Sequence, residues 1–443
     1  MSRISVFGTG YLGATHAAGM AELGHEVIGV DIDSAKIERL ARGEVPFFEP
    51  ELPELLRTHV ESGRLRFTTN AAEAADFADV HFIGVGTPQK KGEYAADLRF
   101  VDSVIDTLAP LITRPSVIFG KSTVPVGTAA RLAARLRDLS PVGEDAELAW
   151  NPEFLREGFA VEDTLRPDRL VLGVDPQRPG RAEAVAREVY ATILERDTPF
   201  LVTDLPTAEL VKVSANAFLA TKISFINAIA EVCEATGADV VQLADAIGHD
   251  ERIGRKFLGA GLGFGGGCLP KDIRAFMARA GELGVDQALT FLREVDAVNL
   301  RRRAHVVERA TALVGGSLRE ARIAVLGAAF KPNSDDVRDS PALDVAGQLH
   351  LGGAAVRVFD PQAMENAAAL WPTLTYATSA EDAVVDADLV IVATEWSQFR
   401  AADPVALGAL VAHKRVIDGR NCLPPEEWIA AGWNYVGMGR HAG

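Results

Sequence analysis

The sequence predicts an α/β protein in which two doubly wound parallel-sheet domains are joined by a helical region with one long helix. Strand-like apolar runs alternate with helical patterns along residues 1–200, and the same alternation restarts near residue 322. Between them, residues 207–236 contain neither proline nor glycine. We therefore expect three domains, at residues 1–200, 201–315 and 316–443.

The first domain is predicted from strands with almost continuous apolar character, which is typical of a parallel sheet covered on both faces. Helical patterns separate these strands at residues 11–23 and 34–41. The predicted strands are Ile4–Phe7, Glu26–Asp31, Val80–Gly84, Ser116–Phe119 and Leu148–Trp150.

The middle region begins with a predicted helix over residues 207–236, on the order of 45 Å long at 1.5 Å per residue. Its apolar side chains lie on more than one face, which indicates neighbours on several sides. We interpret the region as a helical spacer and a homodimer interface. The apolar side chains are Leu210, Val213, Phe218, Ile223, Phe225, Ile226, Ile229 and Val232.

The last domain is predicted from a shorter series of strands. They lie at Arg322–Gly327, Val356–Asp360, Leu389–Thr394 and Arg415–Asp418. The two α/β domains share an architecture with little visible sequence similarity.

Composition narrows the function classes. The 443 residues are 48% hydrophobic and 24% charged, as in ordinary globular proteins. No run of eighteen apolar residues and no leader-like segment is visible, so we expect neither a membrane span nor a signal peptide. Three cysteines fit a reducing cytoplasm. The net charge of −16 argues against nucleic acid, and an anionic substrate would need a locally basic site.

A glycine motif, Gly8-Thr-Gly-Tyr-Leu-Gly13, follows the first strand and opens the first helix. The motif alone is weak evidence, but Asp31 ends the second strand 18 residues after Gly13. The glycines admit a pyrophosphate to the helix N-terminus, and Asp31 would bind a ribose diol. This context predicts a Rossmann-like site that prefers NAD, because the carboxylate repels the 2′-phosphate of NADP.

Polar loops follow three further strands of this sheet, at residues 86–88, 121–128 and 151–158. Each is an ordinary turn by itself. Together they predict a cleft, because ligands of open α/β sheets bind beyond the carboxyl ends of the strands.

Cys268 lies in the loop Phe264-Gly-Gly-Gly-Cys-Leu-Pro-Lys-Asp272, ahead of a predicted helix. A helix N-terminus and the nearby Lys271 both favour a thiolate, although a glycine turn with an incidental cysteine fits the loop equally well. Lys212 and Asn216 share a face of the long helix. On so apolar a helix, we expect the pair to point into a polar cavity, where a lysine can act as an acid, a base or an oxyanion partner.

The chain resembles the nucleotide-sugar 6-dehydrogenases of the UDP-glucose/GDP-mannose dehydrogenase family. The resemblance covers nearly the whole chain in the family's order. It runs through GTGYLG (8–13), STVPVGT (122–128), NPEFLREG (151–158), AELVKVSANAFLATKIS (208–224), RIGRKFLGAGLGFGGGCLPKD (252–272), AAFKPNSDDVRDSP (328–341) and DGRN (418–421).

The resemblance implies roles for individual residues. Cys268 would be the nucleophile, Lys212 and Asp272 would stabilise the oxyanion and position water, and Thr123, Glu153 and Asn216 would line the same pocket. Around NAD it implies Gly8, Gly10, Tyr11, Leu12, Gly13, Asp31, Lys36, Thr87, Thr123, Glu157, Lys271 and Arg338. For the nucleotide sugar it implies Glu153, Phe154, Leu155, Lys212, Asn216, Phe257, Gly261, Gly265, Lys331 and Arg420, with Arg252 supplied by the partner subunit of a dimer.

The implied reaction is the NAD-dependent four-electron oxidation of UDP-glucose to UDP-glucuronate. The aldehyde formed first would be trapped on Cys268 as a thiohemiacetal, which a second hydride transfer turns into a thioester. No metal is expected. GDP-mannose, TDP-glucose or a UDP-N-acetylhexosamine remain alternative substrates. A nucleotide-sugar sensor or a single-step hydroxyacid dehydrogenase would need no cysteine. Gly267 departs from the family, many members of which have serine before the cysteine.

Overall fold

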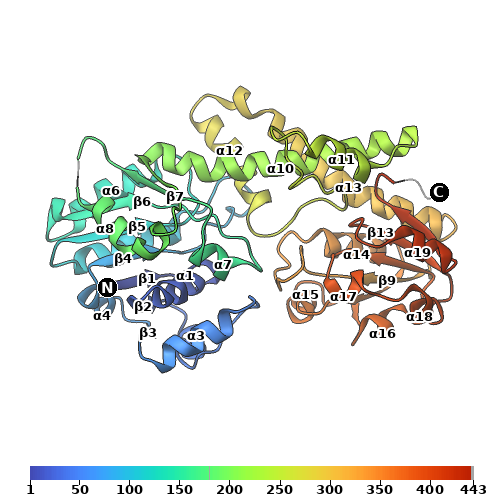
Figure 1. Ribbon diagram of the computed structural model, residues 1–443, viewed down its shortest axis with the longest axis horizontal. Helices are drawn as coiled ribbons and strands as arrows, with labels where there is room; N and C mark the ends of the chain where they lie inside the picture. The colour runs from blue at the N-terminus through green and yellow to red at the C-terminus, as the bar shows by residue number, and fades with distance from the viewer. Residues whose placement is uncertain (179, 441–443) are drawn as a thin grey trace. The chain divides into compact units, whose positions relative to one another are not determined.

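The computed structural model describes residues 1–178 and 180–440, which form two compact units (Figure 1). The first unit contains Met1–Ala215 and Arg274–Leu283, and the second contains Asn216–Ile273 and Gly284–Gly443. The long helix α10 (Leu205–Thr236) and the helix α12 (Leu269–Glu282) begin in one unit and end in the other. Because each unit is compact by itself, each is described separately.

The first unit is built on a sheet with the strand order β3-β2-β1-β4-β5-β6-β7-β8. Neighbouring strands from β3 to β6 pair in parallel, and β7 with β8 forms a parallel pair that meets β6 antiparallel. The strands are β1 (Arg3–Phe7), β2 (Glu26–Val30), β3 (Leu65–Thr68), β4 (Val80–Ile83), β5 (Ser116–Gly120), β6 (Ala146–Trp150), β7 (Leu170–Val174) and β8 (Phe200–Asp204).

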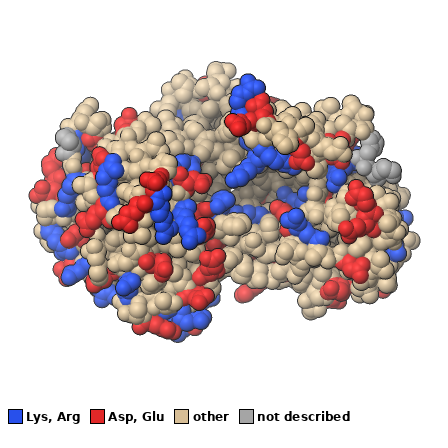
Figure 2. Space-filling view, viewed as in Figure 1, with Lys and Arg blue, Asp and Glu red and all other residues tan. Residues whose placement is uncertain are grey.

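Helices cover both faces of this sheet. One face packs against α1, α3, α7, α8 and α9, and the other packs against α4, α5, α6 and the start of α10. The helices are α1 (Tyr11–Glu22), α2 (Ser34–Ala41), α3 (Leu52–Glu61), α4 (Ala71–Phe77), α5 (Arg99–Leu108), η1 (Ala109–Leu111), α6 (Thr128–Leu139), η2 (Gly143–Asp145), α7 (Ala160–Leu165), α8 (Ala182–Val189) and α9 (Ala191–Leu194). On the face seen in Figure 2, acidic and basic side chains of this unit are interspersed.

The helix α10 spans Leu205–Thr236 and begins two residues before the predicted start. Pro206 falls in its first turn, where a missing N–H costs nothing. The expectation that neighbours cover several faces of this helix stays a prediction, because a partner subunit is among the neighbours that it invokes. Within this chain Phe218, Phe225 and Val232 are more than half exposed.

The second unit holds a parallel sheet with the order β11-β10-β9-β12-β13-β14. Its strands are β9 (Arg322–Leu326), β10 (Ala355–Phe359), β11 (Thr375–Tyr376), β12 (Leu389–Val392), β13 (Arg415–Asp418) and β14 (Asn434–Gly437). Its helices are α11 (Val240–Gly248), the start of α12 (Leu269–Glu282), η3 (Asp286–Leu289), α13 (Phe291–Leu313), α14 (Pro341–Leu351), α15 (Met364–Leu370), α16 (Ala380–Val384), α17 (Ser397–Arg400), α18 (Pro404–Gly408) and α19 (Pro425–Ala430).

The predicted fold class is confirmed: each unit has a doubly wound sheet, and a long helix runs through the middle of the chain. Among the described residues, α10 is also the one helix that could cross a membrane by length and composition, a test that core helices of soluble proteins pass too. The boundaries of the three predicted domains stay a prediction.

Candidate functional site

The turn between β1 and α1 has the geometry that close approach to a phosphate requires. Gly8 has a φ of +88°, and a side chain at Gly13 would collide with the Gly8 carbonyl, 1.7 Å from its Cβ. Gly10 precedes α1, and a Cβ there would meet nothing within 4 Å. No side chain among the described residues caps α1. Its N-terminus is therefore open to an anion, which fits the pyrophosphate of a dinucleotide.

Asp31 follows β2 and faces this turn. Its Oδ2 accepts hydrogen bonds from Thr9 N at 2.8 Å and from Lys36 Nζ at 2.9 Å, and its Oδ1 accepts from Asp33 N. Burial raises the pKa of this carboxyl, but the hydrogen bonds from Lys36 and the backbone outweigh burial and hold the pKa below its usual value. Asp31 is therefore ionised at neutral pH, as a group that selects a ribose diol must be.

Tyr11 and Leu12 open α1. The Tyr11 hydroxyl contacts the buried carboxylate of Glu49 and accepts a hydrogen bond from Gly158 N. Glu49 also accepts from Gly158 N at 2.6 Å and from Ala160 N at 2.7 Å. This cluster joins the end of the 151–158 loop, which contains Glu157, to Tyr11 in the glycine motif at residues 8–13. We call residues 8–13 the dinucleotide turn.

The loop after β5 holds Thr123 beside the loop after β4. Thr87 Oγ1 donates to the Thr123 carbonyl at 2.7 Å, and Ser122 Oγ donates to the Val85 carbonyl at 2.7 Å. Glu209 of α10 accepts from Gly127 N and Ala129 N at the start of α6. Burial raises the pKa of Glu209, so this buried acceptor is costly to ionise.

Glu153 and Lys212 form a buried ion pair. The Lys212 ammonium lies 3.0 Å from Glu153 Oε1, and Glu153 Oε2 accepts from Leu155 N at 2.6 Å. The same ammonium lies 5.7 Å from the centre of the Phe154 ring. The first unit therefore brings together four of the residues predicted from sequence: Glu153, Phe154, Leu155 and Lys212.

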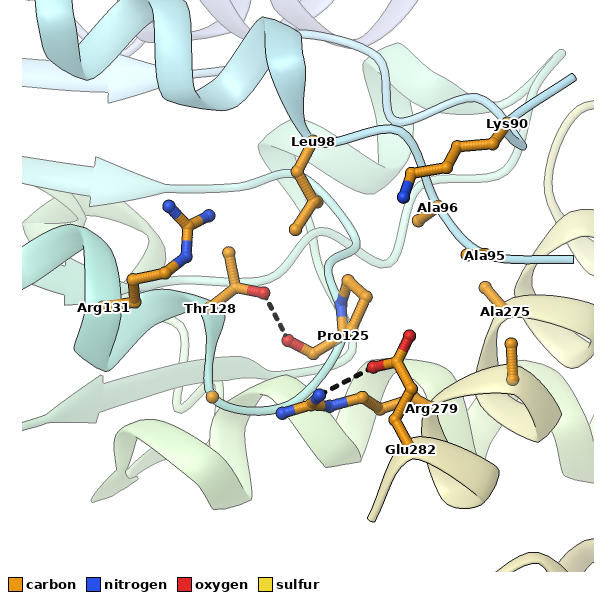
Figure 3. A pocket seen from close by; sticks show the side chains of 12 residues that line it. Lys90, Ala95, Ala96, Leu98, Pro125, Thr128, Arg131, Ala275, Arg279 and Glu282 are labelled. Carbon is orange, nitrogen blue, oxygen red and sulfur yellow. Dashed lines mark hydrogen bonds and ion pairs between the residues drawn. The ribbon is translucent and has the colours of Figure 1, made fainter. Parts of the chain in front are cut away.

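Behind the Thr123 loop lies a pocket of about 230 Å³, bordered by Pro125, Thr128, Arg131 and Arg279 (Figure 3). Its two arginines are already paired, Arg131 with Asp102 and Arg279 with Glu282. The volume is below the ~300–1,000 Å³ typical of ligand sites, so this pocket does not match a dinucleotide.

Cys268 belongs to the second unit and immediately precedes α12. The thiol is exposed, and the Cys268 carbonyl accepts from Asp272 N at 3.0 Å in the first turn of the helix. The buried Asp272 carboxylate accepts from Asn216 Nδ2 at 2.6 Å and pairs with the Lys271 ammonium. Four predicted residues thus converge on the start of α12: Cys268, Asp272, Asn216 and Lys271.

The glycine loop before Cys268 (residues 260–267) is held by α13. Asn299 accepts from Phe264 N at 2.7 Å and donates to the Phe264 carbonyl at 2.9 Å, and Arg303 donates to the same carbonyl. A Cβ on Gly265 would lie 2.2 Å from the Asp339 carbonyl. Glycine is therefore needed at position 265 because neighbouring backbone lies against the loop there.

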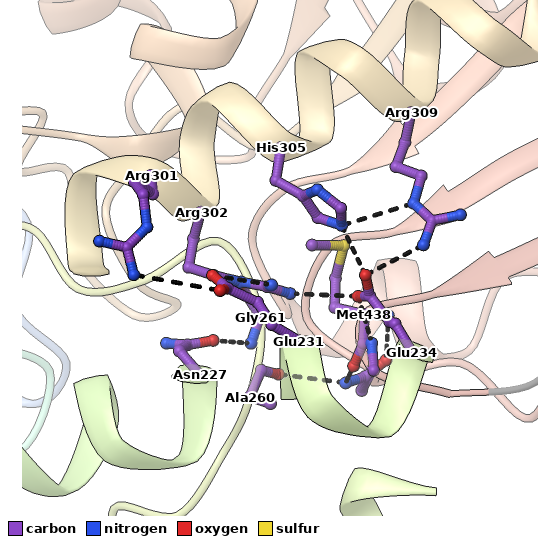
Figure 4. Close-up of polar contacts among 12 residues, drawn as sticks. Asn227, Glu231, Glu234, Ala260, Gly261, Arg301, Arg302, His305, Arg309 and Met438 are labelled. Atoms are coloured by element: carbon purple, nitrogen blue, oxygen red, sulfur yellow. Dashed lines mark hydrogen bonds and ion pairs between the residues drawn. The ribbon is translucent and has the colours of Figure 1, made fainter. Parts of the chain in front are cut away.

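An ionic cluster supports the other end of this loop (Figure 4). Arg302 of α13 is fully buried and donates to the Gly261 carbonyl at 3.3 Å, while Asn227 accepts from Gly261 N at 2.9 Å. Glu234 lies 3.6 Å from Arg302 and 2.7 Å from His305. Burial raises the pKa of Glu234, but the bonds from His305 and the neighbouring arginines outweigh it and lower the pKa to about 2.

Two residues predicted from the C-terminal region, Arg420 and Arg338, border the same loop. Arg420 donates to the carbonyls of Gly263 and Ala393, both at 2.8 Å, so much of its guanidinium is already engaged. Lys331 lies 5.3 Å from the centre of the Phe330 ring. The Arg338 guanidinium occupies the space where a Cβ of Gly267 would point, 2.2 Å from its Cζ.

Two predicted substrate residues are exposed within this chain. The Arg252 side chain pairs with Asp250 and is 88% exposed. Phe257 is 40% exposed and has a φ of +66°, which is strained for a bulky side chain.

The other cysteines differ from Cys268, because burial raises the pKa of both Cys233 and Cys422.

Sequence reasoning missed the side chains that hold these loops in place. They are Glu49, Lys121, Glu209, Asn227, Asn299, Arg302 and Arg303. Lys121 and Glu209 carried a usable signal, since each is a charge within or directly after an apolar stretch. Among the described residues, no group of three or more His, Cys, Asp or Glu side chains could hold a metal ion.

Comparisons with known proteins agree along the whole chain. Three models of the UDP-glucose/GDP-mannose dehydrogenase family match: its NAD binding domain at residues 2–194, its central domain at 206–301 and its UDP binding domain at 324–425. A UDP-glucose 6-dehydrogenase of Rhizobium meliloti is 42% identical over 99% of both chains.

Solved structures show the same likeness. A UDP-glucose dehydrogenase of Pyrobaculum islandicum is 38% identical with a TM-score of 0.91, covering 100% of this chain and 98% of that one. A UDP-D-ManNAc dehydrogenase of Pyrococcus horikoshii is 28% identical with a TM-score of 0.85, covering 99% of each. This chain belongs to the UDP-glucose/GDP-mannose dehydrogenase family.

Proposed function

We propose that this protein oxidises the primary alcohol of UDP-glucose to the carboxylate of UDP-glucuronate, using two NAD and one water. The proposal is carried by Cys268, an exposed thiol at the start of α12 whose neighbours Asp272, Asn216 and Lys271 are already in place. A thiol at this position suits a reaction that must retain an aldehyde between two oxidations.

The dinucleotide turn would hold the cofactor by its pyrophosphate, with Asp31 on the ribose diol. When bound, NAD accepts one hydride in each of the two oxidation steps. Thr87, Glu157, Lys271 and Arg338 are the remaining polar groups that we assign to it.

Cys268 attacks the aldehyde left by the first oxidation and forms a thiohemiacetal. Loss of the second hydride gives a thioester, which water cleaves to the carboxylate and the free thiol. We assign the stabilisation of the oxyanion and the positioning of this water to Lys212 and Asp272, and we assign Thr123, Glu153 and Asn216 to the same reaction. Because Glu153 forms an ion pair with Lys212, the Lys212 ammonium is held in one place before substrate binds.

The substrate assignment follows relatives that are 42%, 40% and 38% identical to this chain and are named for UDP-glucose. The decisive assay measures NADH formed per sugar consumed across UDP-glucose, UDP-N-acetylhexosamines, TDP-glucose and GDP-mannose. We expect two NADH per UDP-glucose and the highest kcat/KM for that substrate. A ratio of one, or no turnover with any of them, would contradict the proposal.

We also propose that the protein works in the cytoplasm as a homodimer. Phe218, Phe225 and Val232 recur every seven residues along α10, so they form one exposed apolar stripe. Arg252 would reach the sugar nucleotide of the partner subunit, which suits its exposure. Light scattering at micromolar concentration should give a dimer, and Phe218→Ser with Phe225→Ser should shift it toward monomer.

Lys331 and Arg420 are proposed to contact the sugar nucleotide, because an acidic protein must gather local positive charge to bind an anion. Lys331→Ala should raise the KM for UDP-glucose while leaving the affinity for NAD nearly unchanged. Arg420→Ala should do the same with an added loss of stability, since its guanidinium also binds the loop. An unchanged KM in both variants would remove them from the site.

A further inference from the structure

Lys121 is a buried cation to which the reaction above gives no role. It follows β5 directly, and only 7% of the residue is exposed. Its ammonium donates to Asn151 Oδ1 at 3.0 Å and lies 3.4 Å from the Asn151 carbonyl. Tyr190 completes the contact, because its hydroxyl donates to the same Asn151 oxygen at 2.7 Å. A lysine is rarely buried this far unless something retains it there.

The partners of Lys121 are neutral. No ion pair joins it to a carboxylate within residues 1–178 and 180–440, whereas Lys212 has Glu153 at 3.0 Å. Aromatic rings of Phe82 and Tyr190 lie at 5.9 and 6.0 Å from its ammonium. Burying an ammonium against amides and rings is costly, so the fold would be more stable with an apolar residue here. A costly group at the edge of a site is a candidate for function.

The charges around Lys121 are few. Glu153 and Lys212 are the charged groups that act on it, the former favouring its protonated form and the latter opposing it. His16 of α1 is buried, and burial lowers its pKa, so this neighbour is neutral at working pH. Tyr190 is neutral as well, since burial raises its pKa. The region therefore contains two ammonium groups and one carboxylate.

The position of Lys121 also matters for geometry. Thr123 lies two residues after Lys121, and Glu153 lies two residues after Asn151. The bond from Lys121 to Asn151 thus joins the loops that follow β5 and β6 at their first residues. A shift of Asn151 away from Lys121 would break it.

We propose that Lys121 is a positioning residue that fixes the Thr123 and Glu153 loops to each other and places a second positive charge beside the Glu153–Lys212 pair. The inference rests on the proposed function, because it assigns Thr123, Glu153 and Lys212 to the reaction. The second charge attracts the Glu153 carboxylate and repels the Lys212 ammonium, so it contributes to the electrostatic environment of this pair.

Two substitutions separate these effects. Lys121→Met keeps the length of the side chain and removes both the charge and the donor, while Lys121→Gln removes the charge and keeps a donor. We expect kcat to fall about 10- to 100-fold in Lys121→Met and less in Lys121→Gln, with little change in the KM for NAD. In both variants the pH–rate profile should move to higher pH, because Lys212 no longer faces a second cation. Lys90→Met, on an exposed lysine of the same unit, is the matched control and should behave as wild type.

A second measurement needs no turnover. Burial lowers the pKa of Lys121 to about 8. Between that pH and the ordinary lysine value of about 10.4, the unfolded chain binds more protons than the folded one, so stability rises with pH in this window. Lys121→Met lacks this contribution. Its stability relative to wild type should therefore fall as denaturant titrations move from pH 7 to pH 10.

The outcomes are distinguishable. If wild type reduces NAD with UDP-glucose and folded Lys121→Met keeps its kcat and pH profile, Lys121 has no positioning role. A stability difference that does not change with pH would show that the buried charge is absent. If wild type turns over no sugar nucleotide, the proposed function fails, and the catalytic part of the inference fails with it. The pH dependence of stability still tests whether the buried Lys121 is charged in the folded protein.

Discussion

The dinucleotide turn and the cysteine loop are both rich in glycine, but they are held in place by different means. The turn at residues 8–13 is fixed by its own strand and helix, with Asp31 reaching it from the next strand. The loop at residues 260–267 has no strand of its own and is held by Asn227, Asn299 and Arg302 from two helices. A site built from adjacent strands can therefore be predicted from residues that lie close together in the sequence. The cysteine loop, by contrast, is held by residues that lie far from it in the sequence.

The largest effect should come from the residue at the end of that loop. Cys268→Ala removes the nucleophile, so kcat should fall by at least about 10³-fold, as loss of an essential nucleophile does. NAD should bind as in wild type, because the dinucleotide turn is untouched. Cys268→Ser should allow the first oxidation and leave a slowly hydrolysed ester whose mass can be measured.

The control is Cys422→Ala, in which a thiol of raised pKa is removed from the second unit. It should keep turnover near the wild-type rate. NADH production by the three variants, with mass spectrometry of the serine variant, decides the matter. Two NADH per sugar from Cys268→Ala at the normal rate would exclude the covalent mechanism.

The independence of the two loops can be tested at Asn299, whose side chain forms two hydrogen bonds with Phe264 of the cysteine loop. Asn299→Leu leaves the buried Phe264 N–H without this partner, at about 1–3 kcal/mol, while the Phe264 carbonyl keeps the bond from Arg303. We expect kcat to drop about 10- to 100-fold while the dissociation constant of NAD stays within about twofold. Calorimetric titration of NAD beside the steady-state rates tests this. Equal losses in kcat and in the affinity for NAD would mean that the dinucleotide turn and the cysteine loop are not held independently.

This difference explains how much the sequence predicted. The motif at residues 8–13, Asp31 and the cysteine before a helix were all visible, since each depends on residues close together in the chain. The support for the cysteine loop was not visible, because Asn299 and Arg302 lie more than thirty residues later on a helix whose charged residues resemble surface groups. Strand β8 was missed as well, and it is an edge strand on which Leu201 and Val202 are exposed.

A smaller effect is expected at the turn at residues 8–13, where Asp31 should determine the preference for NAD over NADP. Asp31→Asn keeps the size of the side chain but removes the charge that opposes a 2′-phosphate, and it leaves Lys36 without its carboxylate. The ratio of kcat/KM for NAD over NADP should fall about tenfold or more, equivalent to about 1.4 kcal/mol. Lys222→Met, whose lysine binds carbonyls of the second unit, serves as control. Comparable use of both cofactors by wild type would show that Asp31 does not select.

The smallest expected effect concerns Gly267, where this chain departs from many of its relatives. A serine Cβ at this position would lie 2.2 Å from Arg338 Cζ, so the guanidinium must move. The clash is with the far end of a flexible side chain, and Asp336 can still bind Arg338 after it swings away. Gly267→Ser should therefore fold normally.

If Arg338 contacts NAD as proposed, its displacement should raise the KM for NAD about threefold to tenfold and change kcat less, as the loss of one charged contact does. Arg338→Ala should raise the KM at least as much. The double variant should then match Arg338→Ala alone, because the serine acts only through the arginine. Additive effects in this cycle would mean that Gly267 influences Cys268 directly, through the backbone that joins them.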